Sequence, residues 1–302
     1  MKKLFLFLFV AVSAKVVAQT DVDGLFMAKR NFCGGLIYGN ASWDHYWEGQ
    51  LYRNNENIGT VRSQSLLAMG NYGITDKLNV LFMLPWIKND ASAGTLIGQQ
   101  GIQDISLMIK NEAFIKEVKG WLVSGVGLIG GSMPMQDYTA DYLPLALGLK
   151  SQTAMMRLML DAQKNHWFVT ASATGMLRGN VTIDRTAYYT TEMVYSNVVE
   201  MPAMFGFNAR MGWRNGADQI FEVVLDGMNT LGGFDMRRND MPFLSNNMDM
   251  TRIGINTKYM VPKTNGLSIM AGINRVVRGR NMGQSTGITT GLVYQIELKS
   301  NK

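Results

Sequence analysis

The chain has few of the residues that stabilise small secreted domains or build many active sites. It contains one cysteine, so no disulfide can form within it, and only two histidines. After residue 20 no apolar run approaches the roughly 20 residues that a helix needs to cross a bilayer. The fold is therefore neither a disulfide scaffold nor a bundle of membrane helices.

The excess of positive charge is small. Lys and Arg number 29 against 23 Asp and Glu, which gives +6. Removing Lys2, Lys3 and Lys15 leaves 26 − 23 = +3, because residues 1–18 contain no acid. This balance gives no reason to expect a nucleic-acid partner. Glycine is frequent and proline scarce, at 32 and 6 residues, which with many Thr, Tyr, Val and Ile favours strands; the 23 methionines are the unusual feature.

Residues 1–18 have the pattern of a secretory signal peptide. Lys2 and Lys3 precede the apolar run Leu4–Val12, and Val16 and Ala18 occupy the −3 and −1 positions of a cleavage site. The alternative, a membrane anchor, is disfavoured because the apolar run is too short to span a bilayer. The residue directly after the cleavage site is Gln19 and not a cysteine, so we expect no lipid anchor. The mature chain is predicted to work outside the cytoplasm.

The second half of the chain alternates between apolar and polar residues. In Met201–Trp213, Arg252–Val261 and Ile288–Leu298 one face is apolar and the other mostly polar or Gly, with period 2. A helix would need apolar residues at i, i+3 and i+4. The segments run to about ten residues or more, which suits tilted membrane strands of ~9–11 residues better than the ~5–6 of a soluble β-sandwich. Aromatics near their ends, such as Trp213 and Tyr259, suit interfacial girdles.

Connections between the predicted strands alternate between short and long, as in outer-membrane barrels with short periplasmic turns and long extracellular loops. We therefore predict an all-β fold, an antiparallel transmembrane β-barrel of about 12 strands, with 10 or 14 also compatible. Residues 19–42 are expected to form a periplasmic tail or a lumenal plug, and residues 43–302 the barrel. The predicted strands lie near 43–53, 60–74, 78–88, 102–113, 120–131, 152–162, 166–177, 200–214, 218–229, 248–261, 266–277 and 286–298.

Two adjacent segments, Tyr72–Trp86 and Gly101–Phe114, carry a family resemblance. They resemble the outer-membrane transporter family named for the meta-pathway of phenol degradation. That family tends to show a Tyr-Gly-apolar-Thr-Asp turn, a strand ending in Leu-Pro-aromatic, and then Gly-x-x-Asp. The matching residues are Tyr72, Gly73, Thr75, Asp76, Leu84, Pro85, Trp86, Gly101 and Asp104. The usual Gly-Asp dipeptide is absent. The resemblance implies a β-barrel that passes small, often hydrophobic, molecules, and it does not supply a substrate.

Charged residues at inward positions are the first candidate site. Both signs occur on neighbouring strands, which fits either a constriction that selects solutes or a salt-bridge network that fills a narrow barrel. The set that we assign to a lumenal constriction is Asp104, Arg157, Arg210, Glu222, Asp226 and Arg252.

Methionines in the predicted loops are the second candidate. Thioethers are soft ligands that select Cu(I), so methionines at the barrel mouth could capture copper. The alternative is that methionine replaces leucine as a flexible apolar filler. The candidate metal ligands are Met133, Met135, Met236, Met241, Met248 and Met250.

An enzyme is the third candidate and the least supported. Neither His45 nor His166 stands in the His-x-Ser context of a lipid-hydrolysing barrel, and Ser124 lacks the glycines of a nucleophile elbow. We predict a non-enzymatic transporter or channel in the outer membrane of a Gram-negative bacterium. Its expected partners are membrane lipid and a small, hydrophobic or aromatic solute, with no nucleic acid and no cofactor. The alternatives are a metal-handling barrel and a structural or adhesion barrel; the oligomeric state stays open.

Overall fold

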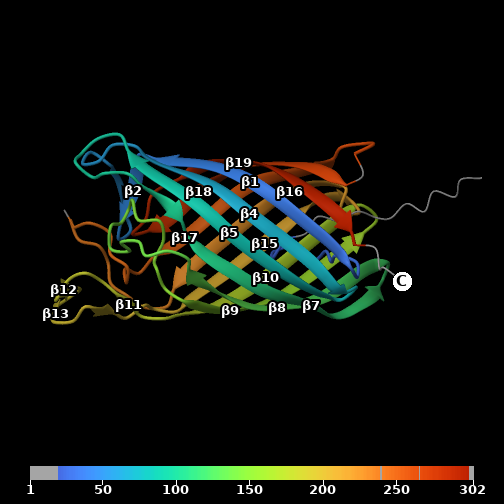
Figure 1. Cartoon of the computed structure of the whole chain (residues 1–302), viewed down its shortest axis with the longest axis horizontal. Helices are drawn as coiled ribbons and strands as arrows, with labels where there is room; N and C mark the ends of the chain where they lie inside the picture. The colour runs from blue at the N-terminus through green and yellow to red at the C-terminus, as the bar shows by residue number, and fades with distance from the viewer. Residues whose placement is uncertain (1–19, 239, 265, 299–302) are drawn as a thin grey trace, which may run out of the picture.

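Twelve antiparallel strands close into a barrel (Figure 1). The computed structural model describes residues 20–238, 240–264 and 266–298, and within these ranges it contains no α-helix. Strand β4 pairs with both β1 and β5, which joins the two edges of the sheet. The barrel strands are β1 (Asn31–Trp43), β4 (Val61–Thr75), β5 (Leu78–Ala91), β7 (Asp104–Val118), β8 (Trp121–Pro134), β9 (Thr153–Lys164), β10 (Trp167–Arg178), β15 (Met204–Asn215), β16 (Gln219–Thr230), β17 (Asp249–Met260), β18 (Leu267–Arg280) and β19 (Thr286–Glu297).

The predicted all-β barrel of about twelve strands is confirmed. The part of the chain that the structure describes has no helix long and apolar enough to cross a membrane. Seven shorter strands lie outside the ring of twelve or extend it: β2 (His45–Glu48), β3 (Leu51–Asn54), β6 (Gln99–Ile102), β11 (Val181–Thr182), β12 (Tyr188–Tyr189), β13 (Met193–Val194) and β14 (Val198–Val199).

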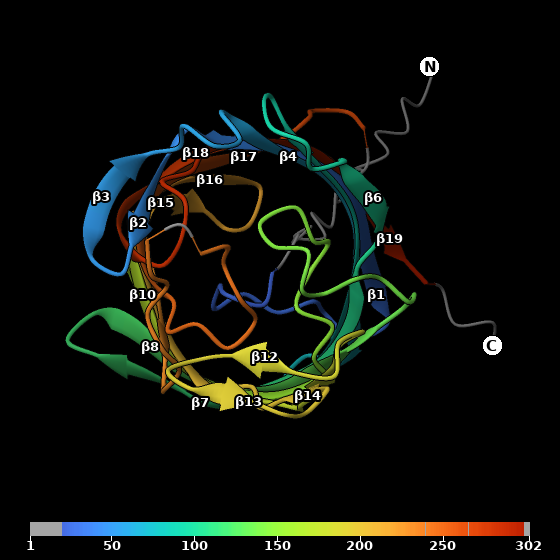
Figure 2. The same cartoon turned by 90° about the vertical axis from the view of Figure 1, so that its left-hand side faces the viewer.

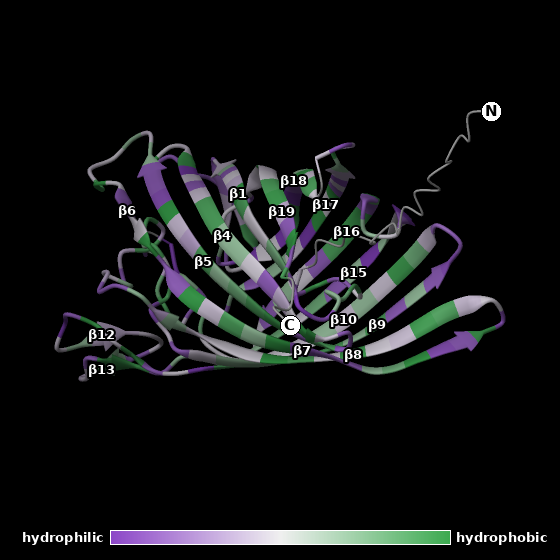
Figure 3. Cartoon of the chain, turned by 45° about the vertical axis from the view of Figure 1, so that its right-hand side comes forward, coloured by the Kyte–Doolittle hydropathy of each residue, from purple (hydrophilic) through white to green (hydrophobic). Residues whose placement is uncertain are grey.

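The alternation of side chains explains why these segments form a membrane barrel. In β10 the side chains of Trp167, Val169 and Leu177 are exposed on the outer face. Phe168 and Thr170, at the positions between, are buried on the inner face. Bands of apolar and polar residues alternate along the strands in the same way around the wall (Figure 3). An apolar exterior suits lipid, and the closed ring satisfies the backbone hydrogen bonds without leaving an edge.

The two ends of the barrel differ in the length of their connections. Short turns join β4 to β5, β7 to β8, β9 to β10 and β15 to β16, and we call this the turn end. Long segments follow β1, β5, β8, β10 and β16 at the opposite end, which we call the loop end (Figure 1). This is the alternation that the sequence predicted.

The first barrel strand is not the predicted one. Residues 43–53 were expected to form it, but β1 covers Asn31–Trp43, and His45–Asn54 form the separate hairpin β2–β3 at the loop end. Glycines make Asn31–Trp43 look like a loop, since they weaken a strand in isolation. Pairing with β19 on one side and β4 on the other overrides that weakness. The predicted signal peptide lies outside the described residues.

One turn also begins later than predicted. The strand expected over residues 102–113 continues as β7 to Val118, past a register shift between Glu112 and Phe114. A β-bulge of this kind adds a residue to one strand while pairing resumes beyond it. The β7–β8 hairpin is consequently longer than the sequence pattern indicated.

Loops at the loop end pack against one another over the barrel mouth (Figure 2). Their buried residues form one apolar cluster drawn from three long loops, for example Tyr138, Val199 and Leu244. Burial raises the pKa of Tyr138, whose hydroxyl donates a hydrogen bond to the Asp104 carboxylate at 2.7 Å. The loops therefore form a packed cap.

Asn281, the residue directly after β18, also holds the cap together. Asn281, at 1% exposure, accepts hydrogen bonds from the backbone N–H of Gly49 and Met236 at 2.7 and 3.0 Å. Its amide donates to Asp235 and to the Asn247 carbonyl, both at 2.8 Å. Arg280 also bonds Asp235 at 2.7 Å, and these hydrogen bonds lower the pKa of the Asp235 carboxyl. Asn281 thus joins three loops.

Candidate functional site

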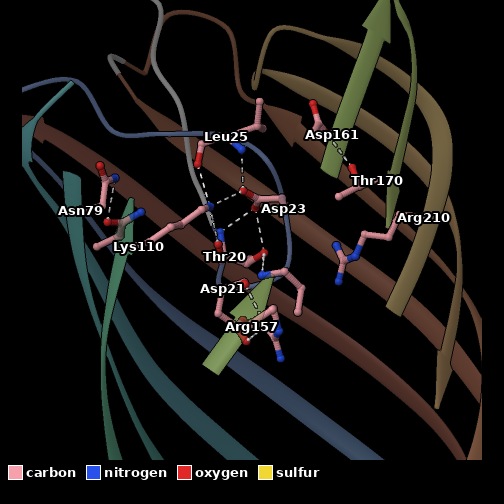
Figure 4. A network of polar contacts seen from close by, with 12 residues as sticks. Thr20, Asp21, Asp23, Leu25, Asn79, Lys110, Arg157, Asp161, Thr170 and Arg210 are labelled. Atoms are coloured by element: carbon pink, nitrogen blue, oxygen red, sulfur yellow. Dashed lines mark hydrogen bonds and ion pairs between the residues drawn. The ribbon is translucent and has the colours of Figure 1, made fainter. Parts of the chain in front are cut away.

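Residues 20–30 lie inside the barrel, and we call them the N-terminal plug (Figure 2). The main anchor is Lys110 of β7, whose side chain is fully buried. Its ammonium donates to the Thr20 and Leu25 carbonyls at 3.0 and 2.8 Å, and to Asp23 at 3.1 Å. Figure 4 shows these contacts converging on the plug from the barrel wall. Of the two positions that the sequence left open, this part of the segment occupies the lumenal one.

A second anchor comes from Arg157 of β9. Its guanidinium donates to the Asp21 carbonyl at 2.8 Å and to the Asp21 carboxylate at 2.7 Å. The plug also fits the wall closely. A Cβ on Gly24 would overlap the Asp161 side chain, and a Cβ on Gly73 of β4 would overlap the Ala28 carbonyl. Two charge-assisted anchors and this close fit hold the plug in the lumen.

The predicted constriction residues occupy inward positions, but most of them are paired. Arg210 bonds Glu222 at 2.8 Å, and Arg252 bonds Asp226 at 2.6 Å. Arg157 pairs with Asp21 of the plug rather than with another wall residue. Asp104 lies apart from these pairs, beneath the cap, where it accepts a hydrogen bond from Tyr138. The arrangement is a set of neutralised pairs along the wall.

Two groups of charged residues were not among the predicted constriction residues. Asp161 and Arg214, at 4–6% side-chain exposure, form a pair at 2.5 Å that the Thr170 hydroxyl joins at 2.5 Å. Asp21 and Asp23 of the plug were missed because the barrel was expected to begin at residue 43. Their signal in the sequence is two acids within five residues of the predicted cleavage site, opposite a wall with inward cations.

A cavity of about 330 Å³ lies inside the barrel beside the plug, and we call it the vestibule. Arg157 and Asp21 border it, and the inner faces of the strands form its wall. Of its 19 lining residues seven are methionines, and Phe207 is the remaining large apolar one. The seven are Met83, Met108, Met155, Met176, Met204, Met228 and Met250.

The loop methionines predicted as metal ligands do not gather at one place. Met133 lies in β8 with its side chain on the outer face, and Met135 is exposed in the following loop. Met236 and Met241 border a small pocket between loops. Of the predicted six, Met250 is the member that lines the vestibule, and Met248 precedes β17. Among the described residues, no group of three or more His, Cys, Asp or Glu side chains could hold a metal ion.

The two histidines serve local contacts. His45 bonds Asp44 at 2.7 Å, which lowers the pKa of that carboxyl, and its ring stacks on Tyr52 at 5.2 Å. His166, in the turn between β9 and β10, lies 3.3 Å from the Arg214 carbonyl and packs against Trp213. These are structural contacts of a loop and of a turn.

Comparison with known proteins rests on the fold. No family model and no curated protein matches the chain, so the resemblance to the phenol meta-pathway family stays a prediction. An outer membrane channel from Pseudomonas putida F1 is similar, with TM-score 0.72 and 13% identity over 93% of this chain and 100% of that one. The NanC porin and the KdgM porin in complex with disordered oligogalacturonate each align with 86% of this chain. The NanC alignment covers 100% of that chain with a TM-score of 0.44 and 8% identity. The KdgM alignment covers 98% of that chain with a TM-score of 0.42 and 7% identity. The chain has the fold of an outer-membrane β-barrel.

Proposed function

We propose that the protein is an outer-membrane channel for passive passage of small molecules, and that the N-terminal plug closes it in the state described here. The observation that carries the proposal is the plug itself. Residues 20–30 are held inside the barrel by Lys110 and Arg157, with the vestibule on their loop side. Because the plug is one short segment rather than a globular domain, it can be displaced without unfolding the barrel.

The size and lining of the vestibule suit a small solute, including a hydrophobic or aromatic one. Its volume of about 330 Å³ is near the lower end of the roughly 300–1,000 Å³ typical of small-molecule sites. Thioether side chains adapt to irregular apolar shapes and make favourable contacts with aromatic rings. The carboxylates of Asp21 and Asp226 are paired with arginines, so neither presents an unbalanced charge to a neutral solute. The proposal involves no cofactor and no catalysed reaction.

The direct test is the ionic current through the refolded protein in a planar bilayer. The truncation must remove residues 20–30 and stop there, because residues 31–43 are β1 and close the barrel. We expect little current from the intact protein and steady current from the truncated one. A milder variant, Asp21→Asn with Asp23→Asn, weakens both anchors and should raise the fraction of time spent open.

The control for the milder variant is Asp137→Asn, the same change at an exposed loop acid outside the plug. It should leave the current of the intact protein unchanged. Silence of a truncated barrel that is folded, as judged by its strand content, would contradict the channel and leave a structural or adhesion barrel. Equal steady current before and after truncation would contradict closure by the plug.

A further inference from the structure

Seven methionines line the vestibule, and an eighth, Met69, pairs with one of them across β4 and β5. We call the eight residues Met69, Met83, Met108, Met155, Met176, Met204, Met228 and Met250 the methionine belt. Met176 lies directly opposite Met155 on one side and Met204 on the other. Met69 faces Met83, and Met228 faces Met250. Opposed residues in an antiparallel sheet have Cα atoms only ~4.5–5.5 Å apart, so neighbouring thioethers of the belt can reach a common point.

Side-chain packing brings part of the belt together. Met108 is 2% exposed, and Met83 and Met155 pack against the cluster that it forms with Leu81 and Leu128. Met176 stands opposite Met155 on the next strand. Four sulfur-bearing side chains from β5, β7, β9 and β10 therefore line one sector of one cavity. Met204 is engaged differently, because its sulfur accepts a hydrogen bond from Arg178 at 3.3 Å.

The composition of the wall argues against methionine as a mere apolar filler. The lipid-facing surface is built largely from Leu, Ile and Val, which fill apolar positions in this chain. In the vestibule seven of 19 lining residues are methionines, and no leucine, isoleucine or valine lines it. The lining of the vestibule therefore differs in residue type from the lipid-facing surface, and its sulfur atoms can contact a solute.

Thioether sulfur is a soft donor that binds Cu(I) and similar ions in preference to hard divalent cations. The two carboxylates that line the vestibule are already paired, since Asp21 pairs with Arg157 and Asp226 with Arg252. We propose that the methionine belt binds a soft monovalent cation, Cu(I) or Ag(I), centred on Met83, Met108, Met155 and Met176. The inference rests on the proposed function in so far as the vestibule is the path of the solute.

The test uses Ag(I), which needs no reductant, titrated as its nitrate into the full-length protein in detergent and followed by calorimetry. Cys33, a buried cysteine, is first changed to Ala so that the thioethers are the soft ligands measured. The belt variant is Met83→Leu with Met155→Leu and Met176→Leu, because leucine keeps the apolar volume and removes the sulfur. The control is Met133→Leu with Met156→Leu and Met211→Leu, at outward side chains with 56%, 55% and 61% exposure.

We expect saturable silver binding by the Cys33→Ala parent, a loss of affinity of at least about tenfold in the belt variant, and no change in the control. X-ray absorption at the silver edge should show sulfur neighbours in the parent. Absent binding by the parent, or equal binding by all three proteins, would overturn the proposal. Potassium current through plug-deleted barrels separates the two hypotheses: current without silver binding sinks the metal site alone, and silver binding without current sinks the channel alone.

Discussion

Gly24 touches the barrel wall at a place where no larger residue fits. An alanine there would bring its Cβ into the Asp161 side chain, which is itself fixed by Arg214 and Thr170. We predict that Gly24→Ala prevents full docking of the plug and raises the ionic current severalfold, with no loss of barrel stability. Gly175→Ala is the matched control, since its Cβ meets no atom within 4 Å. Identical currents for the two variants would contradict the close fit.

The Asp161–Arg214 pair is also a stability determinant. Both side chains are buried, so removing one partner leaves an uncompensated charge, at a cost of about 3–5 kcal/mol. We predict that Asp161→Leu lowers the free energy of unfolding by an amount of this order in urea titrations of the micelle-bound barrel. The double variant Asp161→Leu with Arg214→Leu should be less destabilised than Asp161→Leu alone. If the loss of unfolding free energy in the double variant equalled the sum of the losses in Asp161→Leu and Arg214→Leu, the two charges would act independently.

At the scale of elements, Asn281 fastens several loops of the cap to one another. Its side chain holds segments near Gly49, Met236 and Asn247, and its backbone has φ of +52°. Asn281→Gly tolerates that φ and removes the hydrogen bonds, so we predict faster amide exchange in the loops and unchanged exchange in the barrel strands. Asn165→Gly, at φ +54° in the turn between β9 and β10, is the control. Equal protection of the cap in both variants would contradict the fastening role.

At the scale of the whole molecule, the loop end and the turn end lie at opposite ends of the barrel and should face opposite sides of the membrane. Residues 54–57 follow the β2–β3 hairpin at the loop end, whereas Gly216 is in a short turn at the opposite end. If the long loops are extracellular, an epitope inserted after Asn54 will bind antibody on intact cells. The same epitope after Gly216 should bind only after the outer membrane is permeabilised. The reverse pattern would contradict the proposed orientation.

Much of this architecture could be predicted from local pattern alone. Alternation over segments such as Met204–Asn215 specifies an apolar outer face whatever the neighbours are, and long and short connections identify the two ends. The side-chain period of two predicts inward charges such as Arg210 and Glu222, which form a largely buried pair in the structure. The partners of those charges did not follow from the pattern.

The sequence by itself determined which face of each strand meets lipid, since that depends only on the residues of the strand. Tertiary structure decided what local pattern cannot contain. Glycine-rich Asn31–Trp43 became β1 because β19 and β4 pair with it. Residues 20–30 lie in the lumen because Lys110 of β7 and Arg157 of β9 form ion pairs with the acids of this segment. Methionines spread over 182 residues, from Met69 to Met250, became one belt only when barrel closure brought their strands into register. Contacts between distant segments depend on the closed ring, and no single segment encodes them.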